Sequence, residues 1–160
     1  MHVLLTEDQE LFKRTVREFA EREIAPVAAE HDENETFPSA NVKKMGELGL
    51  MGLTVPTEYG GTGAGPVEYA LAMEEVARAD AAHSVILSVN NSLVCEPIVK
   101  HGTEEQKRDY LKRLATGDMI CYVRSSRLYG MSGLAAMIDR GGAAGLPMHC
   151  DFVVGTDGGH

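Results

Sequence analysis

The sequence predicts an all-α fold: a five-helix up-down bundle followed by an irregular or short-stranded, glycine-rich tail. Five segments before residue 118 carry apolar residues at helical spacing and are bounded by capping residues, Gly or Pro. Eight of the 17 glycines fall after that point. Up to Asp118 there are 21 acidic and 12 basic residues, and beyond it three of each. We therefore expect a helical domain over 1–118, and over 119–160 the start of a β-domain or a poorly ordered, non-native tail.

The first two helices are predicted from caps and periodicity. Thr6 and Gln9 have the spacing of a capping box, in which each side chain accepts a backbone N–H. Pro26 is expected to loosen the last turn of the first helix, and residues 31–37 read as a polar loop. The second helix is expected to have Pro38 in its first turn and to end at Gly49. The apolar residues are Phe12, Val16, Phe19, Ala20, Ile24 and Val27 in the first helix, then Val42, Met45 and Leu48.

The stretch TEYGGTGAG, residues 57–65, has two interpretations. Glycines before a helix can present backbone N–H groups to a phosphate. The stretch lacks the spacing of the dinucleotide and P-loop fingerprints, however, and no buried strand of adequate length precedes it. We favour a structural loop.

The third helix is predicted over residues 66–80. Glu74 and Glu75 are adjacent, so they point in different directions on a helix and do not form a catalytic carboxylate pair. We expect both to belong to a solvated face. The apolar face is expected to contain Tyr69, Ala70, Met73, Val76 and Ala77.

The fourth helix, residues 81–100, is apolar all round and is expected to be central. Its small polar residues need hydrogen bonds if they are buried; these are Ser84, Ser88, Asn90, Asn91 and Ser92. His83 and His101 each stand without a second ligand at metal-binding spacing, so no metal site is expected. Thr103 and Gln106 form a second capping box at the start of the fifth helix, which ends at Thr116 and Gly117.

Composition excludes several classes of function. A net charge of -9 argues against nucleic acid and against anionic membranes, which both attract basic patches. No apolar run is long enough to span a bilayer. Three widely spaced cysteines and no visible targeting signal favour the cytoplasm. They are Cys95, Cys121 and Cys150.

Several pieces of the sequence together resemble one known family. LTEDQELFKRTVREFAEREIAPVAAEHD, FPSANVKKMGELG, LGLMGLTVPTEYGG, EEVARADA and SVNNSLVCEPIVKHGTEEQKRDYLKRLATGD occur in the order and at the spacing of the amino-terminal helical domain of flavin-dependent acyl-CoA dehydrogenases. The resemblance covers Leu4 to Asp118. It implies FAD as cofactor, an acyl-CoA substrate and α,β-desaturation of the thioester. It also implies that Val85, Ser88 and Val89 help to line the acyl pocket.

After the fifth helix the resemblance largely ends. GDMICY fits the entry into the family's β-domain, which makes Tyr122 a candidate cofactor-binding residue, but the Thr/Ser-Glu-Pro and Gly-Ser-Asp elements that follow are missing. One hypothesis is a shifted reading frame, since VRSS can be back-translated so that the next frame encodes Ser-Glu-Ala-Pro. The sequence offers no candidate for the catalytic carboxylate that removes the α-proton.

Two functional hypotheses follow. The first is an acyl-CoA dehydrogenase-like polypeptide, truncated or frame-disrupted, that keeps the helical domain and is inactive by itself. The alternative is a non-catalytic helical interaction module that binds dehydrogenase subunits or an acyl thioester. In either case a homo- or hetero-oligomer with dehydrogenase subunits is possible. An unrelated helical scaffold would require all the matches before Asp118 to be coincidental.

Overall fold

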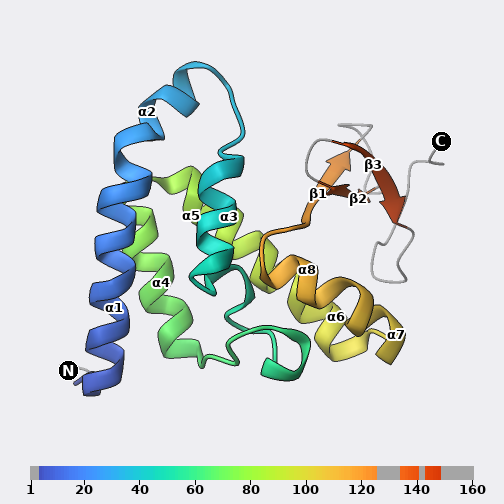
Figure 1. Ribbon diagram of the computed structural model, residues 1–160, viewed down its shortest axis with the longest axis horizontal. Helices are drawn as coiled ribbons and strands as arrows, with labels where there is room; N and C mark the ends of the chain where they lie inside the picture. Colours follow the sequence, from blue (N-terminus) through green and yellow to red (C-terminus); the bar gives the residue numbers. More distant parts are fainter. Residues whose placement is uncertain (1–3, 126–133, 141–142, 149–160) are drawn as a thin grey trace. The chain divides into compact units, whose positions relative to one another are not determined.

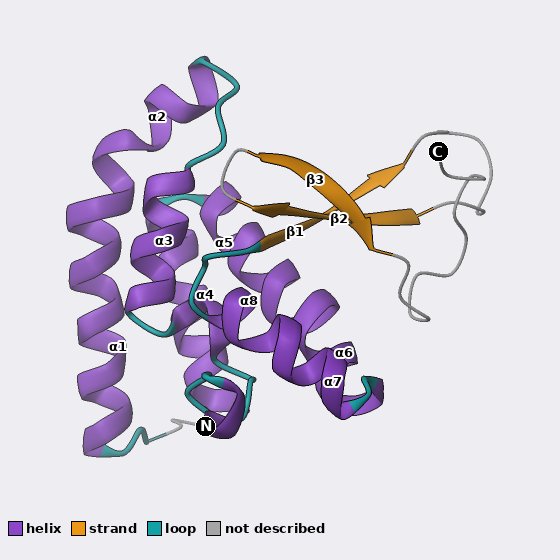
Figure 2. Cartoon of the chain, turned by 45° about the vertical axis from the view of Figure 1, so that its right-hand side comes forward, coloured by secondary structure: helices purple, strands orange, loops and turns teal. Residues whose placement is uncertain are grey.

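A computed structural model describes residues 4–125, 134–140 and 143–148. The chain divides into two compact units, Met1–Gly117 and Asp118–His160. All the described helices belong to the first unit and all the described strands to the second (Figures 1 and 2). The helical segments of the first unit join end to end into five rods, which confirms the predicted helical fold.

The first rod is longer than predicted. It joins α1 (Glu7–Phe19), a π-helical segment η1 (Ala20–Ile24) and α2 (Ala25–Glu33). The predicted capping box is confirmed, because Gln9 N donates to Thr6 Oγ1 at 3.2 Å and Thr6 N donates to Gln9 Oε1 at 3.1 Å. Pro26 lies in the first turn of α2, directly after the wider π-helical turn. The rod therefore continues past Pro26, and the first part of the predicted loop is helical.

The second rod is α3 (Ser39–Glu47), with Pro38 at the cap rather than in the first turn. Gly49 follows with φ of 80°, the left-handed conformation expected of a glycine that ends a helix. Val42 and Met45 are buried as predicted, whereas Leu48 is partly exposed. A Cβ at Gly46 would clash with the carbonyl of Thr116, so α3 meets the end of the fifth rod backbone to backbone.

Two short 3₁₀ turns, η2 (Leu50–Gly52) and η3 (Thr57–Tyr59), link α3 to α4 (Pro66–Ala79). The apolar run that contains η2 is fully buried; its core residues are Leu50, Met51, Leu53 and Val55. Helix α4 lies along α1 (Figure 1). The apolar face predicted for it is correct in part: Val76 is buried and Tyr69 and Met73 are partly buried, but Ala70 and Ala77 are exposed. The other buried residues of α4 are Leu71, Ala72 and Glu75.

The fourth rod joins α5 (Ala81–Ser88), the π-helical segment η4 (Val89–Cys95) and α6 (Glu96–His101). The fifth joins α7 (Glu104–Gln106), η5 (Lys107–Leu111) and α8 (Lys112–Ala115). The capping box of Thr103 and Gln106 is confirmed. Among the described residues, none of the helices combines the length and apolarity needed to cross a bilayer.

The second unit contains an antiparallel sheet in the order β1-β2-β3. Its strands are β1 (Ile120–Ser125), β2 (Leu134–Arg140) and β3 (Ala143–Met148). Tyr122 is opposite Met137, which is in turn opposite Pro147. The described part of the tail is therefore short-stranded.

Candidate functional site

One stripe of the fourth rod faces away from the core. Val85 is 59% exposed and Leu93 is 68% exposed, and Ser88 and Val89 between them are partly exposed. Spacings of three and four residues put these side chains on one side of a helix. The opposite side of the rod is buried, at Leu87, Asn90, Asn91, Val94, Cys95 and Ile98. The three residues expected to line an acyl pocket therefore share one exposed stripe, which we call the Val85–Leu93 stripe.

Ser88, in the middle of the stripe, is held by its neighbours. Tyr69 of α4 donates its hydroxyl to Ser88 Oγ at 3.2 Å, and Ser92 Oγ donates to the Ser88 carbonyl at 2.8 Å. The residue that sequence analysis missed here is Tyr69, which it assigned to an apolar face. Its partner lies on another helix, so no local spacing signal could reveal the pair.

Behind the stripe, two buried amides tie the fourth rod to the turn after α3. Asn91 Nδ2 donates to the carbonyls of Leu50 and Leu87 at 2.9 and 3.0 Å, and its Oδ1 accepts the Thr54 N–H at 3.3 Å. Asn90 Nδ2 donates to the Met51 carbonyl at 2.7 Å and, at 3.3 Å, to that of Leu114. The expectation that these polar residues are hydrogen-bonded is confirmed. Of the fully buried side-chain nitrogen and oxygen atoms in the described residues, only Asn90 Oδ1 has no hydrogen-bond partner.

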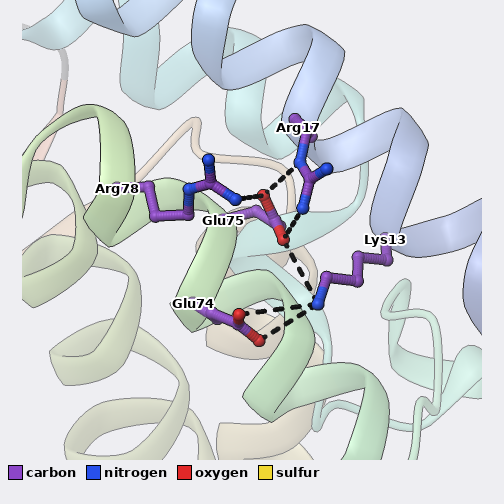
Figure 3. Close-up of polar contacts among 5 residues, drawn as sticks. All are labelled: Lys13, Arg17, Glu74, Glu75 and Arg78. Atoms are coloured by element: carbon purple, nitrogen blue, oxygen red, sulfur yellow. Dashed lines mark hydrogen bonds and ion pairs between the residues drawn. The ribbon is translucent and has the colours of Figure 1, made fainter.

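A second polar cluster joins α1 to α4 (Figure 3). Glu75 is 1% exposed at its side chain, and Arg17 reaches it with two hydrogen bonds of 2.8 Å. Lys13 and Arg78 lie 3.6 and 3.7 Å from the same carboxylate. The Arg17 hydrogen bond outweighs burial and holds the pKa of Glu75 below its ordinary value.

The prediction that Glu74 and Glu75 both belong to a solvated face is therefore wrong for Glu75. The side chain of Glu74 is 54% exposed and lies 3.3 Å from Lys13. The two carboxylates nevertheless approach the same ammonium group, because Lys13 Nζ lies 3.3 Å from Glu74 Oε2 and 3.6 Å from Glu75 Oε1 (Figure 3). Because Glu75 is taken up by three cations, its role is to hold two helices together rather than to transfer protons.

His83 is also less isolated than predicted. It is 1% exposed, its Nδ1 lies 2.6 Å from Asp80 Oδ2, and its Nε2 lies 3.1 Å from Asn41 Nδ2. Asp80 is the cap of α5, three residues before His83, a spacing that could have revealed the pair. Among the described residues, no group of three or more His, Cys, Asp or Glu could hold a metal ion.

The glycine-rich loop has no free row of backbone donors. The five successive N–H groups from Gly60 to Ala64 all donate to carbonyls of residues 52–57, at 2.7–3.2 Å. The Tyr59 hydroxyl donates to Glu104 at 2.8 Å, a bond that raises its pKa to about 12 and pins the loop to α7. A phosphate would have to compete with these bonds, which supports the structural interpretation of the loop.

A flavin carries both a phosphate-bearing tail and an apolar ring, and the described helical residues do not fit either part well. The N–H groups of the loop already donate to carbonyls of residues 52–57, and Val85 and Leu93 of the stripe are exposed. Tyr122 lies in β1, but its side chain falls outside the described residues. Among the described residues, the helical unit by itself therefore shows no flavin-binding site.

Comparison with known proteins shows that this helical domain matches a known family. The family model described as "Acyl-CoA dehydrogenase, N-terminal domain" matches residues 6–118. The first unit is thus an amino-terminal helical domain of the kind that acyl-CoA dehydrogenases contain. The chain belongs to the acyl-CoA dehydrogenase family.

Individual relatives agree with this assignment. The short-chain specific acyl-CoA dehydrogenase of Clostridium acetobutylicum is 51% identical over 116 residues, which is 72% of this chain and 31% of the relative. The bovine mitochondrial short-chain specific enzyme is 46% identical over 135 residues, covering 84% of this chain and 33% of the relative. The chain thus spans about a third of the length of these curated relatives.

Solved structures show the same fold. Glutaryl-CoA dehydrogenase from Mycobacterium smegmatis superposes with a TM-score of 0.74 at 28% identity, over 84% of this chain and 38% of that one. Butyryl-CoA dehydrogenase from Megasphaera elsdenii superposes with a TM-score of 0.68 at 24% identity, over 89% of this chain and 50% of that one.

Proposed function

We propose that this chain supplies the acyl-binding wall of an acyl-CoA dehydrogenase. The observation that carries the proposal is the exposed Val85–Leu93 stripe on the fourth rod of a domain that belongs to this family. Val85, Ser88 and Val89 would contact the acyl chain. The family reaction is flavin-dependent α,β-desaturation of an acyl-CoA thioester, and the proposal limits this chain's share of it to shaping the substrate site.

The geometry of the stripe supports an acyl ligand. Val85, Val89 and Leu93 offer branched apolar side chains in one line, and removing such surface from water stabilises a complex by about 25 cal/mol per Å². Ser88 is fixed by Tyr69, so the wall has a defined shape before a ligand arrives. The amides of Asn90 and Asn91 hold the rod from behind.

Catalysis by this chain alone is not part of the proposal. Removal of an α-proton needs a carboxylate within hydrogen-bond reach of the substrate. Glu75, the buried carboxylate of the described helical residues, is already bound by Arg17. FAD is expected to bind only where a flavin seat is completed, with Tyr122 as a candidate contact.

Methyl NMR tests the acyl wall directly. We expect addition of butyryl-CoA to the full chain to shift the methyl signals of Val85 and Val89, whereas CoA without an acyl group leaves them in place. Val85→Asp should abolish the response of Val89. Leu11→Asp on α1 is the matched control, because Leu11 is 55% exposed and Val85 is 59% exposed, and it should leave the response intact. Equal shifts with CoA alone would refute the acyl wall.

The cofactor proposal is tested on the same sample. We expect the purified chain to be colourless, to leave the spectrum of added FAD unchanged and to reduce no electron acceptor with acyl-CoA. A bound-flavin spectrum would show that the second unit completes a flavin seat and would overturn this part of the proposal.

A second candidate function is a helical interaction module for dehydrogenase subunits. It is favoured by the exposure of Leu93, since large apolar side chains gathered on one surface often mark association sites. Sedimentation with and without Leu93→Asp distinguishes the two functions. Association of the wild-type chain that increases with concentration and is lost in Leu93→Asp supports the interaction module. A wild-type chain that stays monomeric at all concentrations speaks against self-association.

A further inference from the structure

The buried hydrogen-bonded chain at one end of the helical unit contains a titratable group that the proposed function does not use. It runs from the Glu23 carbonyl on η1 through the Asn41 side chain on α3 and His83 on α5 to the Asp80 carboxylate. Figures 1 and 2 show α3 and α5 side by side at this end. Three elements thus depend on the protonation state of one imidazole.

The bonding partners specify which ring nitrogen carries the proton. Asn41 Nδ2 lies 3.0 Å from the Glu23 carbonyl, which can only accept, so this atom is the amide nitrogen rather than the oxygen. The other hydrogen of Nδ2 points to His83 Nε2 at 3.1 Å, which must then be a bare acceptor. His83 Nδ1 carries the proton and donates it to Asp80 at 2.6 Å. The imidazole is therefore neutral in this arrangement.

We propose that the Asn41–His83–Asp80 chain is an acid-sensitive latch on the docking of α3. A proton added at His83 Nε2 would place a donor against the donor Nδ2 of Asn41. The amide must then rotate so that its oxygen accepts from His83, and this rotation takes Nδ2 away from the Glu23 carbonyl. Protonation thus breaks the Asn41 link between α3 and η1.

The other ionisable groups around His83 oppose one another. Asp80 attracts a positive charge on the ring. Burial raises the pKa of Asp80, but the hydrogen bonds from the His83 side chain and backbone outweigh burial and hold this pKa below its ordinary value. His31 on α2 lies with its ring centroid 6.4 Å from that of His83, so it repels the charge when both are protonated. The Glu23 carboxylate is bound by Arg22 and by Lys44, and Glu75 on α4 by Arg17.

NMR of the full chain with ¹⁵N labelling tests the latch. We expect the Nδ1–H tautomer of His83 near neutral pH, and a shared titration midpoint for the His83 ring and the Asn41 side-chain amide. On the acid side, exchange of the Val42 backbone amide, which donates to the Pro38 carbonyl at the start of α3, should speed up about tenfold beyond the intrinsic pH effect. His31→Gln should leave the co-titration in place.

Two variants make the test sharper. Asn41→Asp offers a carboxylate that accepts from protonated Nε2, so the His83 midpoint should rise by about one pH unit. His83→Gln should make the Asn41 signal independent of pH. The latch is refuted by an Nε2–H tautomer, by titration of His83 without a response of Asn41, or by the absence of a His83 titration. The wild-type and His31→Gln measurements decide the matter even if the other variants do not fold.

Discussion

Glu75 and Asn91 are both buried polar side chains that join distant parts of the helical unit, and they are stabilised in different ways. Glu75 is charged and gathers cations from α1 and α4, with Arg17 and Lys13 themselves partly exposed. Asn91 is neutral and is bonded to backbone groups on both sides of a buried turn. The first arrangement depends on charges that water can reach, and the second depends on an amide that water does not reach.

The largest expected loss of stability follows from replacing Asn91, the neutral member of this pair. Asn91→Ala removes three hydrogen bonds that the Asn91 side chain makes to two carbonyls and one N–H in the interior, so we expect a loss of about 3 kcal/mol of unfolding free energy. Equilibrium urea unfolding measures it. Asn90→Ala is the matched control and should cost less, because Asn90 Oδ1 already lacks a partner among the described residues. A larger loss for Asn90→Ala would contradict this account.

In the charged cluster, replacing Glu75 should cost less stability than replacing its partner Arg17. Glu75→Gln keeps a hydrogen-bonding group of the same shape and leaves cations that water can solvate, so we expect a cost of about 1 kcal/mol. Arg17→Met leaves a buried carboxylate with only the longer contacts to Lys13 and Arg78, so it should lower the urea midpoint further.

The control for the Arg17 substitution is Arg14→Met, at an exposed arginine on the same helix. It should leave the midpoint almost unchanged. If Arg14→Met is as harmful as Arg17→Met, the loss comes from the helix and not from the Glu75 cluster.

The smallest and most selective effect is in the pH dependence. The pKa of Glu75 is lowered from 4.5, so its contribution to stability is present above that value and is lost as the pH falls through the lower folded-state pKa. Glu75→Gln should therefore lose less stability than wild type between about pH 6 and about pH 3, measured by urea unfolding. The pH dependence of the unfolding free energy of Asn91→Ala should run parallel to that of wild type. A flattened pH dependence for Asn91→Ala would contradict the distinction between Glu75 and Asn91.

Local signals in the sequence predicted the ends of the helices well. The two capping boxes and the left-handed Gly49 each depend on residues within three or four positions of one another. The hydrogen bonding of Asn90 and Asn91 also follows from residue type. These features are predictable because the partners are close in sequence or because burial leaves few alternatives.

The features that sequence analysis missed depend on contacts between helices. Glu75 was assigned to solvent because its partner Arg17 is 58 residues away. The same reason hides the pairing of Tyr69 with Ser88. A helix with weak amphipathicity such as α4 can turn either face inward, and its neighbours decide which face is buried.

The backbone contact between Gly46 and Thr116 bears on how the chain is made. On the ribosome α3, the second rod, is translated well before the fifth rod, but the carbonyl of Thr116 against which α3 packs emerges only at the end of the fifth rod. The helical unit can thus complete its packing only when Gly117 has left the exit tunnel.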